Sequence, residues 1–211
     1  LVVIDPRALR TLPKRELRGG LAECIKHGMI RDATLFEWIE ANVEAILGLD
    51  MEAMIGLLER NVRIKADVVM EDEKESGVRA HLNFGHTFAH AIEAVQGIAE
   101  GEGKAATDAH YHHGEAVALG MVAATRLAVG QQQCDGAVLD RLIALLQRVG
   151  LPTEAGALPQ TDRLLEAMRL DKKVQGSRIR LVLPLRIGEV TIEDRHADQV
   201  IEAAWDSLRG E

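Results

Sequence analysis

The amino-acid sequence predicts a mainly α-helical domain that carries one small β-hairpin near its C-terminus. Aromatic residues account for only 3% of the 211 residues, while alanine and leucine are abundant, a composition that favours helices. Several segments repeat apolar residues at helical spacing, and the runs "RIRLVLP" and "GEVTI" are typical of two short strands. The chain is long enough to bury one substantial core.

Each expected element follows from a local signal. Pro6 ends the apolar run "LVVIDP", which predicts a short buried strand. Asp50 is a suitable N-cap for a long helix, and Gly150 is a suitable C-cap for another. The expected order is a strand at 1–6, helices at 15–30, 50–71, 80–95, a buried core helix that is apolar on nearly every side at 114–129, helices at 138–149 and 161–170, the hairpin at 178–192, a closing helix from about 196, and a mobile Gly/Ala-rich loop at 97–109.

Charge and cysteine content narrow the class of protein. A net charge of −8 argues against nucleic-acid binding, which requires a basic surface, and no apolar run reaches the roughly 20 residues of a membrane span. No signal peptide is visible, although the chain starts at Leu1 rather than Met. Cys24 and Cys134 lie far apart and form no CxxC motif, so we expect two reduced thiols and a cytoplasmic protein.

A polar stripe follows the expected helix at 80–95. If the helix is continuous, five side chains fall within an arc of about 80°. These side chains belong to Arg79, Asn83, His86, His90 and Glu93. A solvated helix face usually favours lysine and glutamate, whereas this stripe uses residue types that bind anions and metals or transfer protons. The stripe therefore indicates a functional site as readily as a surface.

Two pairs of possible ligand residues have the i,i+4 spacing that can begin a zinc site. One pair is Glu23 and His27, and the other is His86 and His90. Spacing alone does not choose between them.

Three further histidines, at 110, 112 and 113, precede the buried helix at 114–129, and a histidine at the start of such a helix is a candidate ligand. On the long helix after Asp50, Asn61 and Lys65 fall on the expected inward stripe, where a lysine could meet an anion. The apolar members of that stripe are Met54, Leu58, Val62, Val68 and Val69.

Four motifs resemble, in order and spacing, the C-terminal half of the 3-dehydroquinate synthase family. They are "GGLAECIKHGMIRD", "DEKESGVRAHLNFGHTFAHAIE", "HGEAVALGM" and "DKKVQGSRIRLVLPLRIG". The resemblance covers nearly the whole chain and implies a two-domain fold, in which an N-terminal α/β domain binds NAD and a helical C-terminal domain binds zinc and most of the substrate. It implies that residues 1–13 are the exit strand and connection from that N-terminal domain and that 14–211 are the helical domain. The sequence contains no glycine-rich dinucleotide loop.

The resemblance also implies the role of individual residues. The metal, Zn²⁺ or Co²⁺, is expected to bind to Glu23, His86 and His113, an arrangement with open positions that is typical of catalytic zinc. His90 is expected to transfer protons rather than bind metal. Glu75 and Lys26 complete the expected catalytic residues, and the expected substrate-binding residues are Lys65, Arg79, Asn83 and Lys172, the last chosen over Lys173.

The implied reaction converts 3-deoxy-D-arabino-heptulosonate 7-phosphate to 3-dehydroquinate and phosphate, a carbon–oxygen lyase step of the shikimate pathway to aromatic amino acids. NAD is used transiently, and the implied assembly is a homodimer. Without an N-terminal domain we expect the chain to be inactive.

The alternatives are another sugar-phosphate cyclase, a relative of iron-type alcohol dehydrogenases, or a non-catalytic helical remnant. The sequence departs from the family in a longer segment before "HGEAV", which adds His110 and His112, and in Ala89 where glycine is common.

Overall fold

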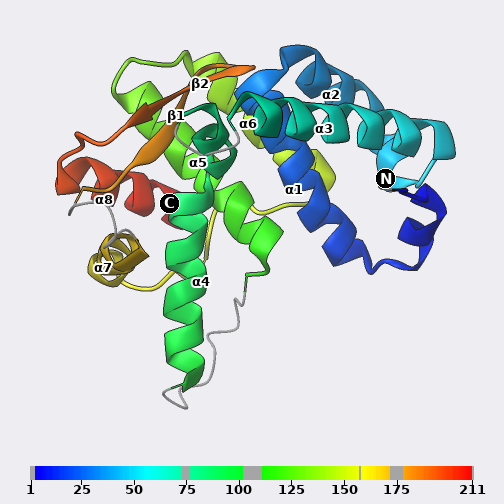
Figure 1. Cartoon of the computed structure of the whole chain (residues 1–211). Helices are drawn as coiled ribbons and strands as arrows, with labels where there is room; N and C mark the ends of the chain where they lie inside the picture. The colour runs from blue at the N-terminus through cyan, green and yellow to red at the C-terminus, as the bar shows by residue number, and fades with distance from the viewer. Residues whose placement is uncertain (1–2, 73–76, 102–110, 157, 172–177, 211) are drawn as a thin grey trace.

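The computed structural model confirms the mainly helical fold with a C-terminal hairpin (Figure 1). It describes residues 3–72, 77–101, 111–156, 158–171 and 178–210. Strands β1 and β2 pair antiparallel. The elements in chain order are η1 (Pro6–Thr11), α1 (Lys14–Arg31), α2 (Ala33–Leu47), α3 (Met51–Glu71), η2 (Val78–Asn83), α4 (His86–Gly101), α5 (His113–Gly130), α6 (Gly136–Val149), α7 (Thr161–Asp171), β1 (Leu181–Arg186), β2 (Glu189–Glu193), α8 (Asp198–Asp206) and η3 (Ser207–Arg209), where η denotes a 3-10 helix.

Helix α5 is the centre of the fold. Every residue from Ala116 to Thr125 is buried, which confirms the core helix expected from its apolar sequence. Helices α1, α4, α6 and α8 and strand β1 all contact it (Figure 1). Because α1, α4 and α5 meet here, residues that are distant in sequence come together at their ends. No helix within the described ranges is long and apolar enough to cross a membrane.

The expected helix caps are present. The carboxylate of Asp50 accepts a hydrogen bond from the backbone N–H of Ala53 at 3.0 Å, and Gly150 ends α6 in the left-handed conformation at φ +83°. Helix α2 was not among the expected elements. The sequence signal for the start of α2 is Asp32, the N-cap, whose side chain accepts hydrogen bonds from the N–H groups of Thr34 and Leu35.

The expected strand at 1–6 is wrong over residues 3–6, and residues 1 and 2 lie outside the described residues. Residues 3–5 have no regular structure, and the side chains of Val3 and Ile4 are 82% and 49% exposed. The next residues form the 3-10 helix η1, whose first turn is capped by Asp5. A strand requires a neighbouring strand to satisfy its backbone hydrogen bonds, and in the described part of the chain the only strands are β1 and β2.

The expected continuous helix at 80–95 is also wrong, because the chain breaks between η2 and α4. Gly85, with φ +79°, makes the break, and the first α4 hydrogen bond runs from the Ala89 N–H to the Gly85 carbonyl at 3.0 Å. The polar stripe from Arg79 to Glu93 is therefore divided between two elements. Helix α4 continues to Gly101, so the loop expected at 97–109 is helical over 97–101, and its remainder lies outside the described residues.

The inward stripe expected on α3 is partly wrong. Met54 and Val68 are buried as expected, but Val62 is 49% exposed and Val69 is 36% exposed. The buried face of α3 consists of Ala53, Met54, Leu57, Asn61, Ile64 and Val68. Several apolar side chains of α3 consequently point outward and line a groove with two residues near the start of the chain. We call this groove the α3 apolar surface; it is lined by Ile4, Pro6, Ile55, Leu58, Glu59, Val62, Arg63 and Ala66.

We predict that Gly120→Ala destabilises the fold. A Cβ atom at Gly120 would lie far inside van der Waals contact of the carbonyl oxygen of Gly85, where no flexible side chain can yield. Such overpacking typically costs about 1–3 kcal/mol. Gly20→Ala is the matched control, because a Cβ there meets nothing within 4 Å. It should stabilise α1 by about 0.5–1 kcal/mol. Urea unfolding measures the change in the free energy of unfolding for both variants. Equal effects of the two changes would contradict the close contact between Gly120 of α5 and Gly85, the residue before α4.

Candidate metal centre

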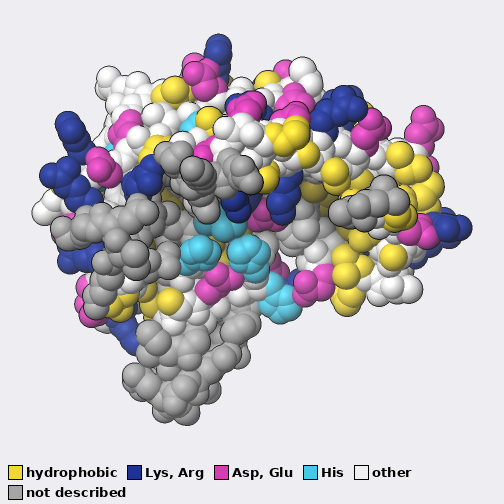
Figure 2. Space-filling model, in the orientation of Figure 1, with side chains coloured by type: hydrophobic (Ala, Val, Ile, Leu, Met, Phe, Trp, Pro, Cys, Tyr) yellow, Lys and Arg dark blue, Asp and Glu magenta, His cyan; other side chains and the backbone are white. Residues whose placement is uncertain are grey.

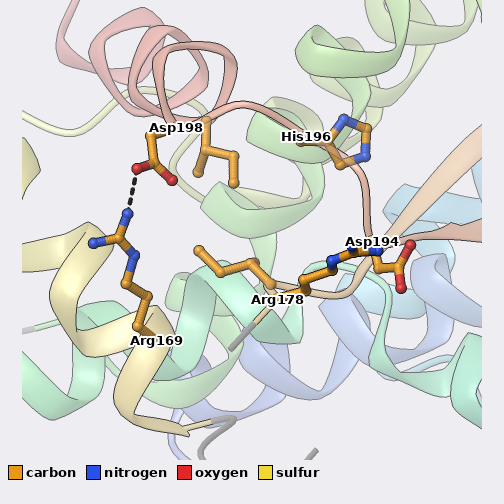
Figure 3. A pocket seen from close by; sticks show the side chains of 7 residues that line it. Arg169, Arg178, Asp194, His196 and Asp198 are labelled. Carbon is orange, nitrogen blue, oxygen red and sulfur yellow. Dashed lines mark hydrogen bonds and ion pairs between the residues drawn. The ribbon is translucent and has the colours of Figure 1, made fainter. Parts of the chain in front are cut away.

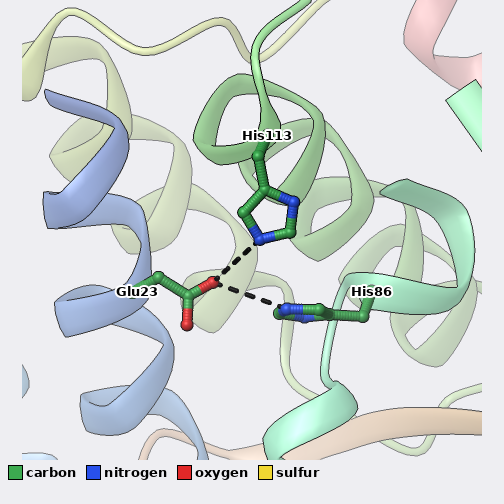
Figure 4. Close-up of side chains that lie close together, drawn as sticks. All are labelled: Glu23, His86 and His113. Carbon is green, nitrogen blue, oxygen red and sulfur yellow. Dashed lines mark ion pairs between the residues drawn. The ribbon is translucent and has the colours of Figure 1, made fainter. Parts of the chain in front are cut away.

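Three helices bring one ligand each to a common point. Glu23 lies in the middle of α1, His86 is the first residue of α4, and His113 is the first residue of α5. Their ligand atoms all lie within 4.8 Å of one another, and the side chains point toward one another in Figure 4. Figure 2 shows histidine side chains gathered near the middle of one face, with acidic and basic side chains around them. We call the three residues the ligand cluster.

The hydrogen bonds of the two histidines direct their Nε2 atoms to the centre of the ligand cluster. His86 Nε2 lies 3.5 Å from Oε1 of Glu23, and His113 Nε2 lies 3.8 Å from the same oxygen. The other nitrogen of each ring faces an acceptor: His86 Nδ1 lies 3.3 Å from the Phe84 carbonyl oxygen, and His113 Nδ1 lies 2.9 Å from Oε1 of Glu93. If each Nδ1 donates, each Nε2 presents its lone pair to the centre.

The two carboxylate oxygens of Glu23 have different surroundings. Oε2 accepts a hydrogen bond from Nζ of Lys26 at 2.6 Å, whereas Oε1 is buried and has no hydrogen-bond partner among the residues that the structure describes. Buried carboxylate oxygens are normally satisfied, so an orphaned one facing two imidazole lone pairs indicates that a cation belongs there. The residues therefore fit a divalent metal on the evidence of their own geometry.

Burial and charge set the protonation states of the cluster. Burial, together with the positive charge on Lys26, lowers the pKa of His86 to about 4, so this imidazole is neutral at pH 7 and free to act as a ligand. Burial by itself would raise the pKa of Glu23, but the charge and hydrogen bond of Lys26 outweigh it and hold the pKa below its ordinary value. Burial lowers the pKa of Lys26, and the like charge on Lys65 acts in the same direction.

The donor set suits particular metals. One carboxylate and two imidazoles suit Zn²⁺ or Co²⁺, and three protein ligands leave positions open for a substrate. A structural zinc site would be closed by four protein ligands. Within the described ranges, the cluster of Glu23, His86 and His113 is the group of this kind that the fold assembles.

Neither i,i+4 pair converges as a pair. The ring of His90 stands edge-on to that of His86, with ring centroids 5.6 Å apart, and His90 is exposed one turn further along α4. His27 points to α3 instead, where its Nδ1 lies 2.8 Å from Oδ1 of Asn61. The ligand cluster therefore contains one residue from each pair, Glu23 and His86, together with His113.

Of the three histidines before α5, the structure directs His113 to the ligand cluster. His112 turns to α1, where its Nδ1 lies 2.9 Å from Oε1 of Glu16. Its backbone N–H donates to Oε2 of Glu115 at 2.9 Å, and Arg15 clamps the same carboxylate at 2.6 Å. These contacts hold the start of α5 against α1. His110 lies outside the described residues.

The expected catalytic and substrate-binding residues are only partly accounted for. Lys26 is 3% exposed and bound to Glu23, while Lys65 is exposed on α3. Arg79 and Asn83 lie on η2, directly before the break that leads to His86, and Arg79 is half-buried. Glu75, Lys172 and Lys173 lie outside the described residues.

Two contacts that hold candidate site residues were not expected from the sequence. Asp72 is buried, and its carboxylate accepts hydrogen bonds from the backbone N–H groups of Gly77 and Arg79, which fixes the start of η2. Glu93 meets His113. The polar stripe on α4 contained Glu93 but offered no sign of its partner, which comes from another helix.

A cavity of about 350 Å³ lies beside α7 and the segment that joins β2 to α8 (Figure 3). Arg169 forms an ion pair with Asp198 there, and Arg178, Asp194 and His196 also line the cavity. Its charges of opposite sign largely balance. None of its lining residues belongs to the ligand cluster, so the cavity is not the candidate metal centre.

The helical fold and the open ligand cluster suit a metal-binding domain. A family model described as 3-dehydroquinate synthase C-terminal matches residues 20–174, and the chain belongs to this family. It is 44% identical over 210 residues to the 3-dehydroquinate synthase of a Synechococcus species and 42% identical over 202 residues to that of a Shewanella species. These alignments cover 99% and 96% of this chain but 54% of each relative, so the chain spans about half the length of the curated relatives.

Solved structures show the same fold. The chain matches 2-epi-5-epi-valiolone synthase from Streptomyces hygroscopicus, which has NAD⁺ and Zn²⁺ bound, with a TM-score of 0.83 and 28% identity. It matches 2-deoxy-scyllo-inosose synthase in complex with carbaglucose-6-phosphate, NAD⁺ and Co²⁺ with a TM-score of 0.70 and 21% identity. Each match covers 97% of this chain and 54% of the other. At 21% identity the second match shows the fold alone.

We predict that the chain binds one divalent cation through the ligand cluster. His113→Ala should weaken Zn²⁺ binding strongly, because it removes one of three ligands, whereas His112→Ala should bind as the unchanged chain does, because His112 faces Glu16. Competition against a chromophoric chelator measures the affinity. Full metal retention in His113→Ala, with loss in His112→Ala or His27→Ala, would show that the wrong histidine has been assigned.

Proposed function

We propose that this chain is the metal- and substrate-binding part of a 3-dehydroquinate synthase, which converts 3-deoxy-D-arabino-heptulosonate 7-phosphate to 3-dehydroquinate and phosphate. The observation that carries the proposal is the ligand cluster. Its Glu23 Oε1 is buried, has no hydrogen bond within the described part of the chain, and faces two imidazole Nε2 atoms. Two synthases at 44% and 42% identity support it over nearly the whole chain.

The cationic residues around the ligand cluster suit an acidic, phosphorylated substrate. When bound, the metal supplies Lewis-acid polarisation of substrate oxygens, and NAD, held mainly by an N-terminal domain, supplies reversible hydride transfer. Lys26 neutralises one oxygen of Glu23 and keeps the other directed to the cluster. Lys65 and Arg79 would bind the carboxylate and phosphate of the substrate, and Asn83 would donate amide hydrogen bonds. Lys172 and Glu75 remain proposed members of the site.

His90 is the proposed proton-transfer residue. It lies on α4 one turn after His86, with its ring edge-on to the His86 ring at 5.6 Å, and it is exposed on that helix. It is thus next to the ligand cluster without being part of it. A histidine in this position can exchange a proton with a substrate bound at the metal.

The α3 apolar surface supports a two-domain protein. Ile4, Ile55 and Val62 are each about half exposed, and they line one groove. Exposed apolar grooves of this kind usually mark an interface. Because the relatives are about twice as long as this chain, we propose that an N-terminal NAD-binding half covers the groove. We also propose that the complete protein is a homodimer.

The alternative function is that of another sugar-phosphate cyclase, since the chain also shares its fold with 2-epi-5-epi-valiolone synthase at 28% identity. The two activities differ in substrate. An assay of a full-length protein that contains this chain, with the heptulosonate phosphate and with a seven-carbon sugar phosphate that lacks the carboxylate, separates them. Turnover of the second substrate alone would overturn the synthase assignment.

We predict that His90→Ala, in a two-domain enzyme that contains this chain, retains its metal but loses most of its rate. Removal of a general acid–base group typically lowers kcat by about 10²- to 10⁴-fold. The metal content is measured by atomic emission and the rate by phosphate release. Loss of the metal in this variant would instead make His90 a ligand.

We predict that the 211-residue chain folds but releases no phosphate from the substrate, with or without NAD. Folding is expected because α5 and its neighbours form a complete core. Catalysis is not expected, because hydride transfer requires a nicotinamide held against the substrate. Phosphate release without NAD would indicate metal-assisted hydrolysis and would exclude the synthase reaction for this chain.

We further predict that the N-terminal half of a relative, supplied in trans, binds the chain and that Val62→Lys weakens this binding, since it places a charge in the apolar groove. Val69→Lys is the matched control, because Val69 is an exposed valine of the same helix that does not line the groove. Analytical ultracentrifugation measures the association. Equal weakening by both changes would place the interface elsewhere.

A further inference from the structure

We propose that Glu93 is a positioning residue for the metal, because it holds the ring of His113 in the tautomer and orientation that direct Nε2 to the ligand cluster. This inference rests on the proposed metal site and adds a residue to it. It starts from a hydrogen bond of 2.9 Å between His113 Nδ1 and Oε1 of Glu93. Figure 4 shows that the second ring nitrogen of His113 points away from Glu23. This nitrogen, Nδ1, is the one that lies against Glu93.

The two histidines of the ligand cluster are anchored differently. His86 has its Nδ1 against the carbonyl oxygen of Phe84, two residues earlier in the chain, and its side chain is only 14% exposed. Its own backbone and its burial therefore orient it. His113 has a side chain that is 52% exposed, and its Nδ1 partner is a carboxylate from another helix. The orientation of His113 thus depends on a side chain that a single substitution can remove.

A carboxylate at this position has two effects on a ligand histidine. An ionised carboxylate only accepts hydrogen bonds, so Nδ1 must carry the proton and Nε2 must carry the lone pair that binds the metal. The negative charge also makes the imidazole a stronger electron donor. In metal sites of known chemistry, removal of such a partner typically lowers metal affinity by about 10–100-fold.

The position of Glu93 on α4 makes this contact possible. Glu93 follows His86 by about two helical turns, so both side chains project from the same face of α4. His86 reaches the ligand cluster directly, and Glu93 reaches the far side of the His113 ring. Helix α4 therefore orients two of the three ligands, one through its own side chain and one through a hydrogen bond.

The contact is poorly suited to a purely structural role. The side chains of Glu93 and His113 are 34% and 52% exposed, and ion pairs with this exposure contribute little to folding. An ordinary ion pair would also require a protonated His113, whose Nε2 could not then bind a metal. The two interpretations predict different results for metal affinity and for the tautomer of His113.

The experiment compares Glu93→Ala and Glu93→Gln with a matched control, Glu16→Gln. Glu16 contacts Nδ1 of His112 at the same distance, 2.9 Å, and that pair is also exposed, but His112 is not in the ligand cluster. Three quantities are measured on the purified chain: the Zn²⁺ dissociation constant, the tautomer of His113 in the metal-free chain by ¹⁵N NMR, and the urea midpoint of the metal-free chain.

We expect Glu93→Ala to weaken Zn²⁺ binding by about 10–100-fold and to shift His113 away from the Nδ1–H tautomer, with an unchanged urea midpoint. Glu93→Gln should show a smaller loss, because the amide oxygen still accepts from Nδ1–H but carries no charge. Glu16→Gln should bind Zn²⁺ as the unchanged chain does.

Two results would overturn the role of Glu93 and leave the metal site intact. In the first, Glu93→Ala binds Zn²⁺ as tightly as the unchanged chain, although His113→Ala has lost its Zn²⁺ affinity. In the second, Glu93→Ala and Glu16→Gln lose equal Zn²⁺ affinity, which would reflect only the loss of a negative charge. Unchanged Zn²⁺ affinity in His113→Ala would overturn both the metal site and the role of Glu93. A lowered urea midpoint with an unshifted tautomer would make the contact structural.

Discussion

The ligand cluster depends on two places where helix backbones touch. A Cβ atom at Gly114 would overlap the backbone of Gly19, and a Cβ atom at Gly120 would overlap the carbonyl of Gly85. The first contact joins α1 to α5 one residue after His113, and the second joins α5 to the residue before His86. Glycine at these positions lets the helices approach closely enough for ligand side chains from three helices to meet, because the reach of an imidazole or carboxylate is short.

The carboxylate of Glu23 links the charged groups of the site. Glu23 gives one oxygen to Lys26, which is 3% exposed, and keeps the other for the ligand cluster. A buried lysine is stable next to a half-buried carboxylate because the two charges are paired, so each residue holds the other in place. Burial lowers the pKa of His86, and the charge of the same lysine acts in the same direction, which favours the neutral ring that a metal requires. The charge of Glu23 and the protonation state of His86 therefore both depend on Lys26.

The sequence predicted most of the fold because the signals for helices are local. Asp50 and Gly150 mark helix ends, and the apolar run of α5 predicts a core helix, whatever the remaining chain does. The errors lie where the outcome depends on distant partners. The run at 1–6 has no neighbouring strand among the described residues, Gly85 breaks the helix where α4 meets α5, and only packing decides which apolar face of α3 is buried.

The sequence by itself determined the set of chemical groups and the family, since the order and spacing of four motifs name Glu23, His86 and His113 as ligands by resemblance. Only the tertiary structure decided how those groups meet. Spacing along one helix only relates a residue to its neighbours on the same helix. By spacing alone, His27 and His90 were as suitable for metal binding as the residues of the ligand cluster. The ligand cluster and its contact with Glu93 join different helices, and their geometry follows from the packing of α1 and α4 against α5, which no local pattern contains.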